Sequence, residues 1–209
     1  MADRPGAGGQ TATAAVLVAV GSAVWLLRQA SLRWGATSSE ARAALPGDDL
    51  VPVPDYAATN ATTVQAAPSQ VWPWLVQMGA YTRAGWYSFD RFDNGGVPSA
   101  WQIVPELQHL QVGDVLPTDR DGTGFVVERL DPPHAMVLVI REQGTVTSSV
   151  FVLRKHDAGT RLLYRLRLTA PRSTVGGRYR LLMELGRVPM TLSMLAGIRR
   201  RAESSRPGS

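Results

Sequence analysis

The sequence TRLLYRLRLT, residues 160–169, decides the fold class of this chain. Apolar side chains alternate with arginines along it. In a strand, one face would carry Leu162, Tyr164, Leu166 and Leu168, and the other face would carry Arg161, Arg165 and Arg167. A period of two is typical of a strand in an antiparallel sheet with one buried face and one solvated face. The stretch therefore predicts a sheet whose leucine face is buried and whose arginine face meets water.

The same period continues toward the N-terminus. Strands are expected over residues 124–130, 136–141 and 146–155, because turn sequences rich in Pro, Asp and Gly separate them. A shorter strand is expected over residues 59–65, and Pro68 is well placed in the first turn of a helix that follows it.

A long helix is expected to close the domain over residues 175–202. Its apolar stripe recurs at spacings of four and three, through Leu181, Leu185, Val188, Leu192 and Leu195. Consecutive antiparallel strands followed by one long amphipathic helix predict an α+β fold in which the helix lies across a bent sheet.

Seven segments of the chain resemble the signature sequences of a bacterial branch of the SRPBCC superfamily, the START and polyketide-cyclase-like group. The segments are Arg33-Trp34-Gly35-Ala36-Thr37, Leu45-Pro46-Gly47-Asp48, Ala67-Pro68 with Val71-Trp72-Pro73-Trp74-Leu75-Val76-Gln77-Met78-Gly79, Gly85-Trp86-Tyr87-Ser88-Phe89-Asp90, Ile103-Val104-Pro105-Glu106, Val112-Gly113-Asp114-Val115 and Gly197-Ile198-Arg199-Arg200-Arg201-Ala202-Glu203. The resemblance covers residues 33–203, and its most specific part is the run from Trp72 to Gly79.

This resemblance implies a helix-grip fold over residues 58–203, with a curved antiparallel sheet wrapped on the C-terminal helix. It also implies a deep apolar cavity between sheet and helix, which the superfamily uses for lipids, sterols, polyketides and other hydrophobic small molecules. The superfamily has no shared catalytic set, so the resemblance implies no mechanism.

An uncharged run of about 17 residues, from Thr11 to Leu27, lies near the N-terminus and ends before Arg28. With Trp25 and Arg33 as flanking anchors, residues 11–28 are predicted to form a transmembrane or anchor helix, which would hold the domain on the cytoplasmic side. A cleaved signal peptide and a buried soluble helix are the alternatives. Residues 29–57, rich in Pro and Gly, are predicted to be an extended linker, and residues 1–10 and 204–209 to be disordered.

The charge and the absence of cysteine narrow the chemistry. Although the net charge is +5, residues 58–170 hold ten basic and ten acidic residues, so the excess lies at the chain ends and no nucleic-acid partner is expected. Without cysteine there are no disulfides, thiolate metal ligands or cysteine nucleophiles. Because His109, His134 and His156 are widely separated, no metal or other cofactor is expected.

Residues 83–94 concentrate aromatic and acidic side chains in a predicted loop. Such a loop is suited either to lining an apolar pocket or to forming a small core that packs the loop against the domain. The predicted ligand-binding residues are Trp86, Tyr87, Phe89, Tyr164, Leu166, Leu185 and Leu192. The weak catalytic candidates are Tyr87, Asp90 and Tyr164, because a titratable group against an apolar cavity has a shifted pKa.

Three functions follow as hypotheses. The first is a membrane-tethered binding or carrier module for a hydrophobic small molecule such as a lipid or polyketide. The second is a cyclase-like or dehydratase-like enzyme acting on such a ligand. The third is an interaction module whose C-terminal arginines contact anionic lipid. The sequence leaves the oligomeric state and the ligand open.

Overall fold

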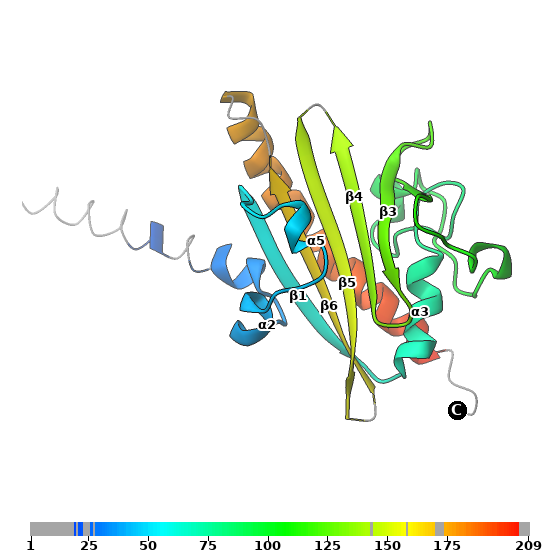
Figure 1. Cartoon of the computed structure of the whole chain (residues 1–209). Coiled ribbons are helices and arrows are strands. Elements are labelled where there is room, and N and C mark those ends of the chain that lie inside the picture. The colour runs from blue at the N-terminus through cyan, green and yellow to red at the C-terminus, as the bar shows by residue number, and fades with distance from the viewer. Residues whose placement is uncertain are drawn as a thin grey trace, which may run out of the picture.

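The computed structural model describes residues 19, 21–22, 26, 28–142, 144–157, 159–169 and 174–204, and the side chains of residues 174–185 lie outside this description. Its centre is an antiparallel sheet of six strands in the order β1-β6-β5-β4-β3-β2 (Figure 1). The strands are β1 (Tyr56–Val64), β2 (Val115–Pro117), β3 (Gly124–Asp131), β4 (Ala135–Glu142), β5 (Thr145–His156) and β6 (Gly159–Thr169).

Helices lie on both sides of this curved sheet. They are α2 (Ser38–Arg42), α3 (Pro68–Val76), α4 (Asp90–Asp93) and α5 (Thr174–Ser204), with 3-10 turns η1 (Asp48–Leu50) and η2 (Pro105–Leu107). The long α5 crosses one face, here called the α5 face, while α2 and η1 lie over the opposite face (Figure 1). The α+β prediction, with its antiparallel sheet and closing helix, is confirmed.

The main core lies between the sheet and the two longer helices. Its largest fully buried side chains include Trp74 and Leu75 from α3, Phe151 from β5, and Leu195 and Ile198 from α5. Each such side chain contributes about 1.5–3 kcal/mol by leaving water. The prediction that the leucine face of β6 is buried is therefore confirmed.

The arginine face of β6 is largely covered, so the prediction of a solvated face is wrong. Residues 34–52, here called the N-terminal strap, lie over it, and Arg165 has only 4% of its side chain exposed. A second, smaller core forms beneath the strap from Leu45, Ala61, Val137, Val150, Val152 and Leu163. The sequence pattern failed here because a guanidinium can be buried when enough oxygen atoms accept its hydrogen bonds.

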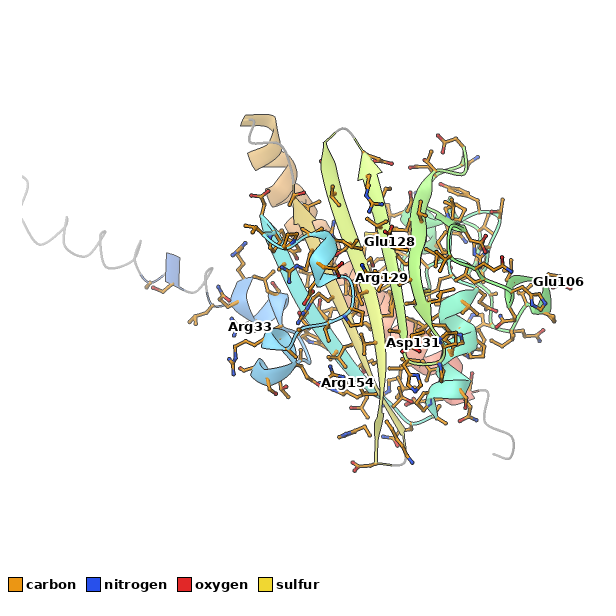
Figure 2. The ribbon with its side chains drawn as sticks, viewed as in Figure 1. Arg33, Glu106, Glu128, Arg129, Asp131 and Arg154 are labelled. Atoms are coloured by element: carbon orange, nitrogen blue, oxygen red, sulfur yellow. The ribbon has the colours of Figure 1, made fainter. Side chains whose placement is uncertain are left out.

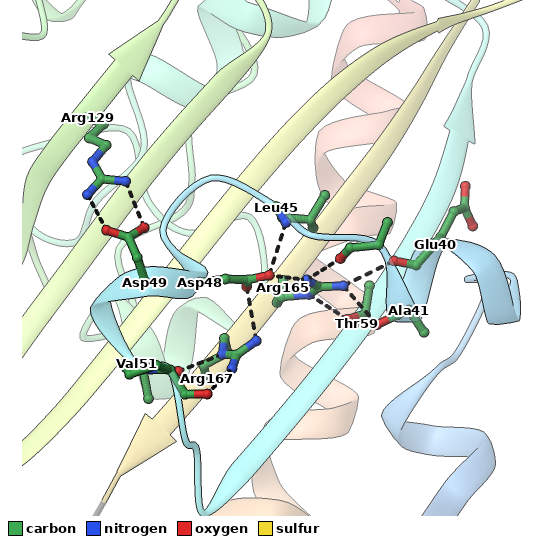
Figure 3. Close-up of polar contacts among 12 residues, drawn as sticks. Glu40, Ala41, Leu45, Asp48, Asp49, Val51, Thr59, Arg129, Arg165 and Arg167 are labelled. Atoms are coloured by element: carbon green, nitrogen blue, oxygen red, sulfur yellow. Dashed lines mark hydrogen bonds and ion pairs between the residues drawn. The ribbon is translucent and has the colours of Figure 1, made fainter.

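Arg165 holds the strap to the sheet with hydrogen bonds to five groups (Figure 3). It donates to the carbonyl oxygens of Glu40 at 3.0 Å, Ala41 at 2.9 Å and Ala43 at 2.8 Å, to the Asp48 carboxylate at 2.7 Å and to the Thr59 hydroxyl at 2.9 Å. The planar guanidinium group has five N–H donors, so it can donate hydrogen bonds to several oxygen atoms from one position.

Three more arginines of the sheet also bind the strap. Arg161 pairs with Glu40 at 2.7 Å, Arg129 pairs with Asp49 at 2.6 Å, and Arg167 donates to the carbonyl oxygen of Val51 at 2.8 Å. Together with Arg165 they are called the arginine clamp. The strap is thus bound along its length to β6 and β3.

The strap also has secondary structure where an extended linker was predicted. Thr37 and Glu40 form a capping box at the start of α2, in which the Thr37 hydroxyl accepts from the Glu40 N–H at 3.1 Å and the Glu40 carboxylate accepts from the Thr37 N–H at 2.7 Å. Five residues separate this short helix from the turn at Asp48, so the prolines and glycines of the strap do not keep it extended.

The predicted anchor over residues 11–28 lies almost entirely outside the described residues, as do residues 1–10 and 205–209. In the part of the chain that the structure describes, none of the helices combines the length and the apolar character needed to cross a membrane. Residues 28–32 are helical, and Leu32 packs against the main core.

Candidate ligand-binding site

The α5 face of the sheet has two ends of different character. The strand register places Met136, Phe151, Leu153 and Leu162 at the end near α3, and all four are fully or almost fully buried. From Tyr164, which pairs with Phe151, toward the other end, the same face mixes polar side chains with apolar ones, among them the fully buried Leu138. We call one set of residues there the polar end; its members are Tyr56, Ala58, Thr147, Ser149, Tyr164, Leu166 and Leu168, with Arg187 from α5.

Tyr164 and Ser149 form a hydroxyl pair inside the polar end. Their oxygens are 3.1 Å apart, and the Tyr164 ring leans on the Phe151 ring with centroids 4.9 Å apart. Burial raises the pKa of the Tyr164 hydroxyl, although the positive charge of Arg187 and the hydrogen bond with Ser149 oppose that rise. Tyr164 therefore stays protonated at neutral pH and serves as a hydrogen-bonding group.

Arg187 lies over the edge of the sheet at β1. Its guanidinium carbon is 5.6 Å from the centroid of the Tyr56 ring, and its Nη1 atom is buried without a hydrogen-bond partner among the described residues. A buried N–H donor that lacks a partner costs about 1–3 kcal/mol, and more when it is charged. Arg187 thus differs from the arginines of the clamp, whose side chains reach carbonyl and carboxylate oxygens.

The structure brings some of the predicted ligand-binding residues together. Tyr164 and Leu166 are buried neighbours on the α5 face of β6, and Leu192 is half-buried on α5. Leu185 lies on the same helix, but its side chain falls outside the described residues.

The predicted aromatic residues of the loop are mostly packed into the core. The Trp86 ring nitrogen donates to the carbonyl oxygen of Pro117 at 3.1 Å, and the Tyr87 hydroxyl donates to that of Trp74 at 3.1 Å. The Arg201 guanidinium stacks 4.4 Å from the Tyr87 ring centroid. Burial raises the pKa of Tyr87 well above its ordinary value, so this hydroxyl is a poor general acid or base at neutral pH.

Asp90 and Phe89 occupy the same loop with different surroundings. The Asp90 carboxylate accepts hydrogen bonds from the Ser99 N–H at 2.9 Å and from the Ser99 hydroxyl, so both of its oxygens hold the loop together. Phe89 is 43% exposed. These contacts favour the alternative in which the loop packs against the domain, because Tyr87 belongs to the main core and Trp86 packs against it.

Ser149 and Arg187, two polar residues of the polar end, were not among the predicted ligand-binding residues. Ser149 could have been found from the register of β5, because it falls two residues before Phe151 on the buried face. Arg187 was missed because the predicted stripe of α5 centred on Val188 and Leu192, which are only half-buried. The side chains of α5 that are buried in the core are those of Thr191, Met194, Leu195, Ile198 and Ala202.

No family model matches the chain, and no curated protein matches it either. The solved structures similar to it include protein Ms6760 of Mycobacterium smegmatis, with 14% identity over 72% of this chain and 92% of that chain and a TM-score of 0.42. Protein SSP2350 of Staphylococcus saprophyticus has 9% identity over 74% and 96%, with a TM-score of 0.45. SA2116 of Staphylococcus aureus, a protein of unknown function, has 14% identity over 72% and 94%, with a TM-score of 0.44.

Proposed function

We propose that the domain binds a hydrophobic small molecule between the polar end of the sheet and α5, as a binding or carrier module. The observation that carries this proposal is a set of polar groups within an apolar surface. Tyr164 and Ser149 bond to one another, and Arg187 has a buried Nη1 atom without a partner among the described residues.

A surface built only for stability would not favour this arrangement. Incompletely paired polar groups in a core are costly, and apolar side chains of similar volume are as stable or more so. Ligand sites, by contrast, combine a mostly apolar lining with a few polar groups that orient the bound molecule. Leu166, Leu168 and the half-buried Leu192 supply the apolar part here.

The division of the α5 face also limits where the molecule would lie. Large side chains fill the end near α3, including Trp74 and Phe151, which leave no surface exposed there. The polar end carries Ala58 and Ser149 at cross-strand positions beside Leu166, and such small side chains fill less of the space under a helix. The anchor predicted over residues 11–28 is not part of this proposal.

Nile red binding tests the proposal, because this neutral dye fluoresces in apolar sites. Ser148 and Ser149 are adjacent in β5 and point to opposite faces, so they form a matched pair. We expect saturable binding, weakened roughly 5-fold or more by Ser149→Val, since the larger side chain projects into the polar end. Ser148→Val, under the strap, should leave the dissociation constant unchanged.

Native mass spectrometry of the purified protein gives a second measurement, since a bound lipid or polyketide-like molecule would add its mass. Protein that carries no added mass and gives no saturable Nile red fluorescence would refute the proposal. Equal effects of the two serine substitutions would place the dye elsewhere and would also count against it.

A further inference from the structure

The polar end has hydrogen-bond donors in excess. A hydroxyl pair such as Tyr164 and Ser149 shares one hydrogen bond, so one of its two O–H hydrogens remains available. The Nη1 atom of Arg187 adds N–H hydrogens that no acceptor meets in the described part of the chain. An acceptor is therefore what this end of the site lacks.

The missing acceptor is expected to be negatively charged. The structure pairs Arg187 with no carboxylate among the described residues, whereas the clamp arginines bind the acids of the strap on the opposite face of the sheet. A guanidinium stays protonated at every physiological pH, and a partly buried charge is stabilised most by an opposite charge in hydrogen-bonding contact.

We infer that the molecule bound at the polar end is a single-chain amphiphile with an anionic head group, a carboxylate or a phosphate monoester, that Arg187 binds. The hydroxyl pair donates to a second oxygen of the head group, while Leu166, Leu168 and Leu192 contact the hydrocarbon chain. This inference rests on the proposed function and specifies, in addition, that the ligand is negatively charged.

Tyr56 would support the guanidinium from the other side. The Arg187 guanidinium carbon lies 5.6 Å from the Tyr56 ring centroid, within the range of a cation–π contact. The ring therefore helps to hold the guanidinium over the sheet, leaving Nη1 for the head group.

The experiment compares three probes of equal chain length in displacing Nile red at pH 8: dodecanoate, dodecyl phosphate and dodecanol. We expect one or both anions to bind at least roughly 10-fold more tightly than the alcohol, because hydrogen bonds to charged groups are the stronger ones. The two anions distinguish a carboxylate site from a phosphate site.

Arg187→Met tests the residue itself. It should weaken binding of the preferred anion roughly 10-fold or more and leave the dodecanol dissociation constant unchanged, and Arg187→Lys should give an intermediate loss. The matched control is Arg200→Met, which removes the same charge from an exposed position of α5. It should change neither anion nor alcohol binding.

Each result decides between the two proposals. Equal affinities for anion and alcohol, or an anion preference that survives Arg187→Met, would overturn the inference while leaving hydrophobic binding in place. If Nile red and all three probes fail to bind, the proposed function itself is wrong. Circular dichroism of each variant verifies that the fold is intact.

Discussion

The two faces of the sheet use arginine in opposite ways. Beneath the strap, Arg165 donates to three carbonyl oxygens, one carboxylate and one hydroxyl, and Arg161 pairs with the Glu40 carboxylate. On the α5 face, Arg187 leaves Nη1 without any acceptor in the described chain. The same residue type therefore uses its donors to hold the fold together on one face and keeps a donor without a partner among the described residues on the other.

The difference shows how the use of its hydrogen-bond donors decides what a buried arginine contributes to stability. A buried guanidinium whose donors are all used contributes to stability and resists removal, because its partners would be left unpaired. One whose donors are not all used contributes little and costs desolvation energy. Substitutions on the two faces should therefore have opposite consequences for stability.

Arg165→Met should have the largest effect on the free energy of unfolding. The substitution leaves the carbonyl oxygens of Glu40, Ala41 and Ala43 without this donor and removes one of the cations beside Asp48. We expect a loss of about 3–5 kcal/mol, as for one partner of a buried ion pair. Urea unfolding at pH 7 measures it.

Arg154→Met is the control for Arg165→Met. Arg154 pairs in register with Arg161 and faces away from α5, but its side chain is exposed (Figure 2). We expect a change within about 0.5 kcal/mol, as for most surface substitutions. If both substitutions cost the same, the clamp does not stabilise the strap as its contacts imply.

Glu40 should make the strap side of the sheet sensitive to acid. Its hydrogen bond with Arg161 is the main cause that lowers the pKa of Glu40 from 4.5 to about 2. Because the folded pKa is the lower one, the stabilisation is complete above pH 4.5 and is lost as the pH falls toward 2. We expect about 1–2 kcal/mol after allowing for solvent screening.

Glu40→Gln isolates that contribution, because glutamine can keep the capping box while losing the charge. The stability difference between wild type and Glu40→Gln should be present at pH 5.5 and shrink as the pH approaches 2, in urea unfolding at each pH. Glu106→Gln is the exposed comparison (Figure 2). A difference that stays constant over this pH range would show that the Glu40 charge is not linked to folding.

The sheet and the closing helix were predictable because local patterns encode them. Period-two runs located β3 to β6 to within a few residues, and α5 was expected over residues 175–202 against the observed Thr174–Ser204. The strap was not predicted to cover the sheet, since its contacts with Arg165 join residues more than a hundred positions apart. Local sequence patterns do not predict hydrogen bonds between residues so far apart in the chain.

The polar end was predicted in part for a related reason. Tyr164 and Leu166 follow directly from the alternation of β6, whereas Ser149 required the register between β5 and β6. The face of α5 was shifted by about one residue from the predicted stripe, because a helix with apolar side chains on several sides does not fix its own rotation. That rotation is decided by the sheet beneath it, and it brings Arg187 to Tyr56.

Arg187→Met should have the smallest effect on stability. No partner of Nη1 is lost in the described structure, and the substitution removes a charge that is costly to bury, so the free energy of unfolding should stay within about 0.5 kcal/mol of wild type or rise. Urea unfolding without added ligand measures it, beside Arg165→Met. A loss of about 3 kcal/mol or more would make Arg187 a structural arginine like those under the strap, and the contrast between the two faces would no longer hold.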